Sequence, residues 1–223
     1  GSEFKVNTYT TIDQYDSSIT TLTNNGGFVV TWTSSGQDGN GTGIYAQRYN
    51  TNGIAQGAEF KVNTFITGDQ TNASIIALNG GGFVVTWTSS GQDGSGAGIY
   101  AQRYNALGVA QNGEFKVNTF ITGGQTNPSI TALTNGGFVV TWESSGQDGS
   151  GSGIYAQRYA ANGVAQGGEF KVNTFTVGDQ TNPSITGLND GGFVVSWSSG
   201  NQDSSGRGVF AQRYDANGVA VET

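Results

Sequence analysis

The strongest constraint on the fold is a sequence repeat of about 55 residues that occurs four times. Tryptophan recurs at intervals of 55 residues, each time within the motif GGFVVTW or GGFVVSW. A second motif, EFKVNT, begins at residues 3, 59, 114 and 169; its first interval is one residue longer because the turn before Phe28 reads TNNGG. Such a period is typical of proteins built from copies of one supersecondary unit. The tryptophans are Trp32, Trp87, Trp142 and Trp197.

Each repeat contains four segments that are typical of β-strands. In the third repeat they are residues 128–133 (PSITAL), 137–144 (GFVVTWES), 153–159 (GIYAQRY) and 169–174 (EFKVNT). These segments are rich in β-branched and aromatic residues, which favour strands. Glycine-rich stretches such as TNGG separate them, as in antiparallel hairpins. The sequence therefore predicts an all-β fold in which each repeat forms one antiparallel four-stranded sheet.

Packing groups lie on both faces of these predicted strands. In the second segment of the third repeat, Phe138, Val140 and Trp142 share one face, and Val139 and Thr141 share the other. A sheet of a two-layer sandwich would keep one face in water, whereas radially stacked sheets cover both. We therefore expect a four-bladed β-propeller. The predicted blades comprise residues 17–64, 73–119, 128–174, and 183–214 together with 3–8.

The order of the segments predicts how such a ring closes. The chain opens with a fourth strand, EFKVNT, at residues 3–8, and its last repeat lacks a complete fourth strand. We expect residues 3–8 to pair into the last blade, because this pairing would remove two exposed sheet edges. The alternative is an oligomeric ring, such as a dimeric eight-bladed propeller. The expected state is thus a monomer or a small homo-oligomer.

Charge and composition argue against several classes of function. The formal net charge of −7 repels phosphate backbones, so we expect no nucleic-acid partner. No apolar run approaches the roughly 20 residues of a membrane-spanning helix, so we expect no membrane insertion. The chain has no cysteine and no histidine, which excludes disulfides and thiol chemistry and removes the commonest general base.

The acidic loop between the second and third strands of each repeat is the first candidate site. It reads DGNGTG, DGSGAG, DGSGSG and DSSGRG in the four repeats. Oxygen atoms at alternate positions resemble a Ca²⁺ loop, yet one carboxylate per loop is too few unless a neighbouring loop contributes. An aspartate that caps its own glycine turn is the favoured interpretation, with Ca²⁺ as the alternative. The candidate metal ligands are Asp38, Asp93, Asp148 and Asp203.

A second acidic position lies in the links between repeats, where it could share a ligand with the neighbouring loops. Glutamine follows it in every repeat, which makes the glutamines candidate ligand-binding residues. Gly124 interrupts the acidic series, so a carboxylate is not required in every repeat. The acidic positions are Asp13, Asp69 and Asp179, and the glutamines are Gln14, Gln70, Gln125 and Gln180.

Aromatic residues next to the acidic loop are candidates for an exposed ligand-binding face, whereas the mid-strand tryptophans are expected in the core. Arginine in the QRY motif is expected to pair with the glutamate of EFKVNT or to stack on an aromatic ring between blades. The aromatic candidates are Tyr45, Tyr100, Tyr155 and Phe210.

Four near-identical repeats offer copies of one group rather than the distinct acid and base that catalysis needs. Glu143 is the clearest exception, because threonine or serine occupies its position in the other repeats. A glycosidase would need a second carboxylate about 5–10 Å away, and no second residue is indicated. We therefore expect no enzymatic activity and an exposed Glu143.

The run GGFVVTW…GIYAQRY…NGVAQGGEFKVNT resembles a tandem repeat of very large secreted bacterial proteins, which often carry cadherin-like modules and RTX-type calcium-binding nonapeptides. The resemblance covers essentially the whole chain. It implies a secreted, extracellular or cell-surface setting and an adhesion role, but the nonapeptide itself is absent. The expected function is a non-catalytic module that binds glycans or another cell-surface ligand at several sites. The alternatives are a ligand-free structural spacer or symmetric design and, more distantly, a glycosidase.

Overall fold

The computed structural model describes residues 2–23 and 26–222, and the strands within them form four sheets of four. The first sheet holds β1 (Gln14–Thr21), β2 (Phe28–Ser35), β3 (Thr42–Tyr49) and β4 (Phe60–Lys61). The second holds β5 (Gln70–Ala77), β6 (Phe83–Ser90), β7 (Ala97–Tyr104) and β8 (Ala110–Lys116). The third holds β9 (Gln125–Ala132), β10 (Phe138–Ser145), β11 (Ser152–Tyr159) and β12 (Ala165–Lys171). The fourth holds β13 (Gln180–Gly187), β14 (Phe193–Gly200), β15 (Arg207–Tyr214) and β16 (Ala220–Val221).

Within each sheet the strands pair antiparallel in chain order, which confirms the predicted four-stranded units. Corresponding residues keep the same register in every sheet; Trp142 lies opposite Tyr155, as Trp87 lies opposite Tyr100. The first strand of each sheet begins earlier than predicted. In the third repeat it starts at Gln125 rather than residue 128, because a β-bulge accommodates the proline.

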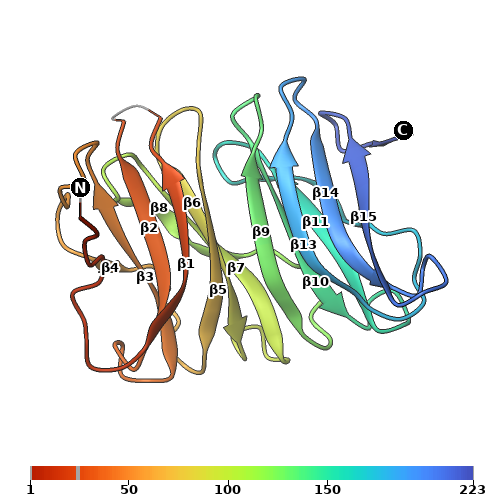
Figure 1. Ribbon diagram of the computed structural model, residues 1–223, viewed down its shortest axis with the longest axis horizontal. Coiled ribbons are helices and arrows are strands. Elements are labelled where there is room, and N and C mark those ends of the chain that lie inside the picture. The colour runs from red at the N-terminus through yellow and green to blue at the C-terminus, as the bar shows by residue number, and fades with distance from the viewer. Residues whose placement is uncertain (1, 24–25, 223) are drawn as a thin grey trace.

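The four sheets stack in sequence order along the long axis of the molecule (Figure 1). Their first strands, β1, β5, β9 and β13, contact one another in succession and form the inner side of the stack. Apolar side chains from facing sheets fill the space between them. Phe138, Val139 and Trp142 of β10 are fully buried although they point to opposite faces of the sheet. Both faces of the internal sheets are thus covered, as the sequence predicts.

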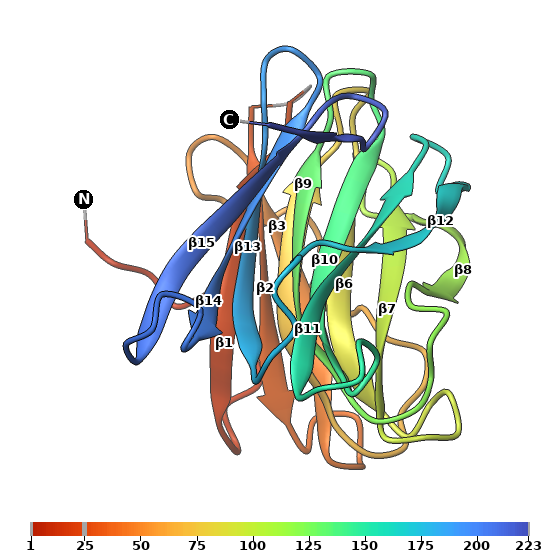
Figure 2. The same ribbon diagram turned by 90° about the vertical axis from the view of Figure 1, so that its right-hand side faces the viewer.

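The ends of the stack are different, because each has one sheet face without a neighbouring sheet. The side view shows the last sheet at the near end, with no sheet beyond it (Figure 2). Val209 of β15 is 81% exposed, whereas Ile154, its counterpart in β11, is fully buried. Ile19 of β1 is 63% exposed, whereas its counterpart Ile75 is 5% exposed.

The described residues do not show the predicted ring closure. Residues 3–8 form no strand, and the described strand on the outer edge of β15 is β16, which pairs with Arg213 and Tyr214. Instead Phe4 packs against Tyr49 of the first sheet, with ring centroids 5.3 Å apart. The first and last sheets lie at opposite ends of the stack, which keeps residues 3–8 away from β15 (Figure 1). No helix among the described residues has the length and apolarity to cross a membrane.

Candidate functional site

A β-bulge in the first strand of every sheet shapes the inner side of the stack. In β9, Asn127 and Pro128 together lie opposite Trp142, between the pairs Thr126–Glu143 and Ser129–Thr141. Asn127 has a φ of 54°, a left-handed conformation that asparagine and aspartate adopt more readily than most residues. Bulges re-aim side chains and are over-represented next to active sites. The corresponding residues are Asp16 (φ 50°), Asn72 (φ 56°) and Asn182 (φ 56°).

The bulges line an open groove of about 490 Å³ along the inner strands. All four sheets contribute to it, and its walls carry hydroxyl, amide and proline groups. Among the residues that the structure describes, Asp16 is the only charged one that lines it, and no lysine or arginine does. The lining residues are Asp16, Ser17, Ser18, Asn72, Ala73, Ser74, Asn127, Pro128, Ser129, Asn182 and Pro183.

Hydrogen bonds connect the groove residues from sheet to sheet. The Asn72 side-chain amide donates to Oδ1 of Asn127. Asn127 Nδ2 in turn donates to Oε1 of Glu143 at 2.9 Å, and the backbone N–H of Asn182 donates to the same oxygen at 2.6 Å. Three of the four sheets therefore meet in one network of amides and one carboxylate.

Glu143 is the centre of this network and is 8% exposed, so the expectation of an exposed strand glutamate is wrong. The cause is the bulge, which brings Asn127 over the end of the side chain. The carboxylate accepts hydrogen bonds from its own sheet and from the next one, and so it links the two sheets. Buried carboxylates are stable only when hydrogen bonds of this kind compensate for lost hydration.

The aromatic residues predicted to form an exposed face are mostly inside the stack. Tyr45, Tyr100 and Tyr155 are only 7%, 7% and 6% exposed, which corrects the expected exposure. They face the previous sheet or segment because every second residue of the third strand points that way. Burial, followed by the charges of Asp148 and Glu169, raises the pKa of Tyr155 to about 12. Phe210 is partly buried against the apolar side chains between the third and fourth sheets, which include Trp197.

The four glutamines of the inter-repeat links serve the structure at the entry of the first strands. Gln70, Gln125 and Gln180 are fully buried, and Gln14 is partly exposed. Gln125 Oε1 accepts a 3.0 Å bond from Asn118 Nδ2, and Gln70 and Asn63 repeat this contact. These side chains connect the end of one sheet to the start of the next and do not line the groove.

The aspartates predicted as metal ligands cap their own turns. Oδ1 of Asp148 accepts the backbone N–H of Ser150 at 3.2 Å, and Asp93 does the same with Ser95 at 3.1 Å. Within residues 2–23 and 26–222, no three acidic side chains gather in a group able to hold a metal ion. Asp38 and Asp203 make the same turn contact.

The second acidic position does lie beside the loop of the preceding repeat. Oδ1 of Asp69 accepts the backbone N–H of Thr42 at 3.1 Å, and Asp179 accepts that of Ser152 at 3.0 Å. The carboxylates thus bind backbone donors across the junction between sheets. The sequence predicted that these aspartates lie near the neighbouring loops, but not that they would bind the backbone of those loops.

The QRY arginines do not pair with the EFKVNT glutamates. Arg103 Nη1 donates at 2.8 Å to the carbonyl oxygen of Asn162 in the next sheet. Glu114 instead accepts Gln92 Nε2 and the backbone N–H of Thr64, both at 2.6 Å. The expectation of a repeated ion pair is therefore wrong, because the glutamate and the arginine each bind a different neighbouring segment.

Sequence reasoning missed the groove asparagines, although a signal was present. Every repeat carries the pattern Gln-x-Asn or Gln-x-Asp at the start of its first strand, followed in two repeats by proline. A proline within a predicted strand indicates an edge or a bulge. A bulge beside a repeated asparagine would have predicted a polar residue re-aimed out of the sheet.

Comparisons with known proteins identify the fold. No protein-family model and no curated protein matches this sequence. Among solved structures, the chain is similar to an α-L-arabinanase of Penicillium chrysogenum complexed with arabinobiose, with a TM-score of 0.57 and 16% identity. That match covers 89% of this chain and 60% of the arabinanase.

Two bacterial enzymes show the same likeness. An endo-1,4-β-xylanase of Bacteroides thetaiotaomicron VPI-5482 has a TM-score of 0.55 and 11% identity, over 96% of this chain and 77% of the xylanase. An α-L-arabinofuranosidase of Lactobacillus brevis has a TM-score of 0.51 and 12% identity, over 89% and 73%. The chain thus has the propeller type of fold, similar to that of five-bladed propeller glycosidases.

Proposed function

We propose that this chain is a non-catalytic module that binds a neutral oligosaccharide in the groove of the inner strands. The observation that carries the proposal is the lining of the groove, where amides and hydroxyls from four sheets face one open space. A ligand with many hydroxyl groups and no charge matches such a surface, because each group can donate and accept hydrogen bonds. The groove replaces the separate sites at each repeat that the sequence predicted.

The structural neighbours support the same ligand class. The three solved structures are of an arabinanase, a xylanase and an arabinofuranosidase, and the arabinanase is in complex with arabinobiose. At 11–16% identity they share the fold alone with this chain, so the ligand class rests on the groove. Secretion to the cell surface, implied by the repeat family that the sequence resembles, fits a glycan-binding role.

The test is titration of neutral arabino- and xylo-oligosaccharides against the chain and two variants, followed by calorimetry. Asn127→Gly and Asn182→Gly remove an amide from the groove while keeping the left-handed backbone, which glycine adopts readily. Each is expected to weaken binding about tenfold, the cost of one lost hydrogen bond of roughly 1.4 kcal/mol. Asn112→Gly is the matched control, because Asn112 has a φ of 63° but is exposed on an outer strand.

Two outcomes would oppose the proposal. Failure of every neutral oligosaccharide to bind, or equal affinities of the groove variants and the control, would remove the groove as the site. Release of reducing sugar that Glu143→Gln abolishes would establish the glycosidase alternative instead. That alternative has in its favour the buried Glu143, which is hydrogen-bonded to the groove residue Asn127. Asp16 is the charged residue that lines the groove itself.

A further inference from the structure

The last sheet has an incomplete outer edge. In the third sheet, Tyr155 and Ala156 of β11 pair with Lys171 and Phe170 of β12. In the last sheet, β16 pairs only with Arg213 and Tyr214, three residues farther along β15. The part of β15 that corresponds to Tyr155 and Ala156 pairs with β14 on its inner edge but has no strand on its outer edge among the described residues. A hollow of about 490 Å³ beside it is lined by Ala211, Gln212, Ala220, Val221 and Glu222.

The segment at the other end of the molecule has the sequence and the contacts of the missing strand. Residues 3–8 repeat the EFKVNT motif. Phe4 lies on Tyr49 with centroids 5.3 Å apart, as Phe170 lies on Tyr214 at 5.4 Å. The Tyr49 hydroxyl donates to the carbonyl oxygen of Val6 at 3.2 Å, which repeats the bond from Tyr214 to Val172 at 3.3 Å. Residues 3–8 therefore bind the first sheet as the strand of a preceding sheet would.

This segment makes only half of the contacts that its copies make. In the third sheet, Val172 N–H donates to the carbonyl of Ile154, and the N–H of Ile154 donates to Asn173 Oδ1, both at 2.7 Å. Val6 and Asn7 make no corresponding bonds within the described chain. The residue that corresponds to Ile154 in the last sheet is Val209, the most exposed large apolar side chain at 81%.

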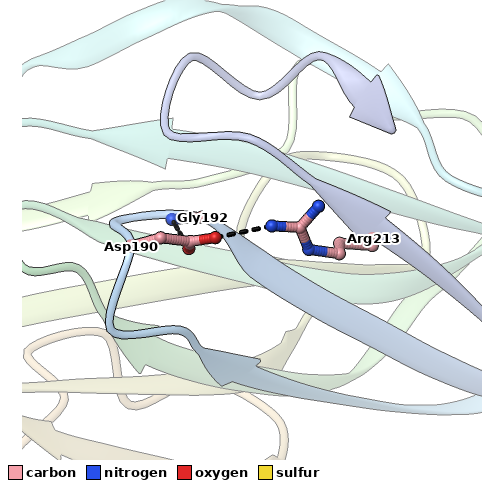
Figure 3. Close-up of polar contacts among 3 residues, drawn as sticks. All are labelled: Asp190, Gly192 and Arg213. Atoms are coloured by element: carbon pink, nitrogen blue, oxygen red, sulfur yellow. Dashed lines mark hydrogen bonds and ion pairs between the residues drawn. The ribbon is translucent and has the colours of Figure 1, made fainter. Parts of the chain in front are cut away.

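The arginine contacts between sheets are also incomplete at the two ends of the stack. Arg48, Arg103 and Arg158 each donate to a backbone carbonyl in the turn of the next sheet. Arg213 has no next sheet and bonds instead to Asp190 of its own sheet at 2.5 Å, on the exposed end (Figure 3). In the first sheet, the turn that corresponds to these acceptors contains Asn52 and Gly53, and no arginine in the described part of the chain donates a hydrogen bond to it.

We propose that the last sheet binds residues 3–8 of a second copy of this chain, which add a strand beside β15 in head-to-tail assembly. In this arrangement Val6 and Asn7 of one copy bind the backbone of Val209 in the other, as Val172 and Asn173 bind Ile154. Arg213 leaves Asp190 and donates to the carbonyl of Asn52 across the new junction. Pairing of an extended segment with an open sheet edge is a common mode of recognition.

A second copy is the partner because the chain's own segment is at the wrong end. Residues 3–8 are held on the first sheet, and β15 lies at the opposite end of the stack (Figure 1). The two faces are unlike each other, so the contact is heterologous and forms either a ring or a filament. The smallest closed form is a ring of two chains and eight sheets. This proposal is independent of sugar binding in the groove.

The test is the mass in solution by light scattering over a range of concentrations. The expected mass rises from 23.1 kDa at high dilution to about twice that value at higher concentration. Val209→Glu is expected to keep the chain at 23.1 kDa with an unchanged melting temperature, because the side chain is exposed in the single copy. Val164→Glu is the matched control, since Val164 is 57% exposed on a turn, and it should associate like the parent chain.

Deletion of residues 1–8 provides a second variant and is also expected to abolish association. A mass of 23.1 kDa at every concentration, with melting lowered by Val209→Glu, would overturn the proposal in favour of closure within one chain. Association that Val209→Glu and the deletion leave unchanged would overturn it in favour of another interface.

Discussion

At the residue scale, the contact that recurs between sheets is an arginine side chain lying on a glycine. A β-carbon added to Gly163 would lie 2.8 Å from Cδ of Arg103, and Gly163 has a φ of 85°. Only glycine fits here, because both the backbone conformation and the close approach exclude a side chain. The arginine then reaches the carbonyl of Asn162 beside it. The repeated NG or LG dipeptide thus has a role in joining sheets as well as in turning the chain.

Replacement of Gly163 by alanine should therefore cost more stability than replacement of another left-handed glycine. Gly167 is the matched control, since its φ is 75° and an added β-carbon would contact nothing within 4 Å. We expect a loss of about 1 kcal/mol for Gly167→Ala, from backbone strain alone. Gly163→Ala adds a steric clash of about 1–3 kcal/mol. Urea unfolding measures both variants.

The variants Gly163→Ala and Gly167→Ala, each combined with Arg103→Ala, complete a double-mutant cycle. Removal of the arginine side chain should bring the two glycine variants to nearly equal stability, because the clash has lost one partner. A cost of Gly163→Ala that persists without Arg103 would show that the strain lies in the turn itself.

At the element scale, equivalent strands of the four sheets differ mainly in whether another sheet covers them. Ile154 of β11 is fully buried, whereas Val209 at the same position of β15 is 81% exposed. The sequence alone assigns both to the core, since the alternating pattern is the same. Exposure depends on the neighbouring sheet, which the local pattern does not contain.

This difference predicts unequal costs for truncation at the two positions. Ile154→Ala should destabilise the chain by about 2–5 kcal/mol, the range for large apolar side chains removed from a core. Val209→Ala should change stability by less than about 0.5 kcal/mol, as for exposed positions. Thermal and denaturant unfolding at micromolar or lower concentration measure both. A cost above about 1 kcal/mol for Val209→Ala in the single copy would mean that another sheet covers it.

The strands themselves were largely predictable from sequence, and the groove was not. Alternating apolar residues and glycine turns located the strands of each sheet to within a few residues. The first strands start earlier than predicted, and so does the fourth strand of the third sheet, which begins at Ala165 instead of residue 169. The bulge at Asn127 and Pro128 escaped prediction because it depends on which residue of β10 lies opposite. Glu143 was singled out for its residue type, but its burial follows from that bulge and from Asn182 of the next sheet.

At the scale of the whole molecule, a repeat specifies the interface between neighbours but not how many neighbours there are. Every internal junction repeats the same contacts of arginine, tyrosine and EFKVNT, so the sequence predicts the stacking well. Whether the ends meet depends on the small rotation between successive sheets, summed over the chain. No residue pattern encodes that sum, and this explains why closure by residues 3–8 was expected and is not observed.

An open stack should also be less stable at its ends than in its middle, because stability in stacked repeats comes mostly from contacts with neighbours. In dilute solution, amide exchange should be slowest in β6, β7, β10 and β11, and faster in β1, β15 and β16. Their burial supports this order: β10 is covered on both faces, whereas β15 alternates between exposed and covered residues. Exchange measured by mass spectrometry at two concentrations tests it.

If head-to-tail association occurs, β15 should become as protected as β11 at the higher concentration, and the Val209→Glu variant should keep its fast exchange. Equal protection of all four sheets at high dilution would contradict an open stack.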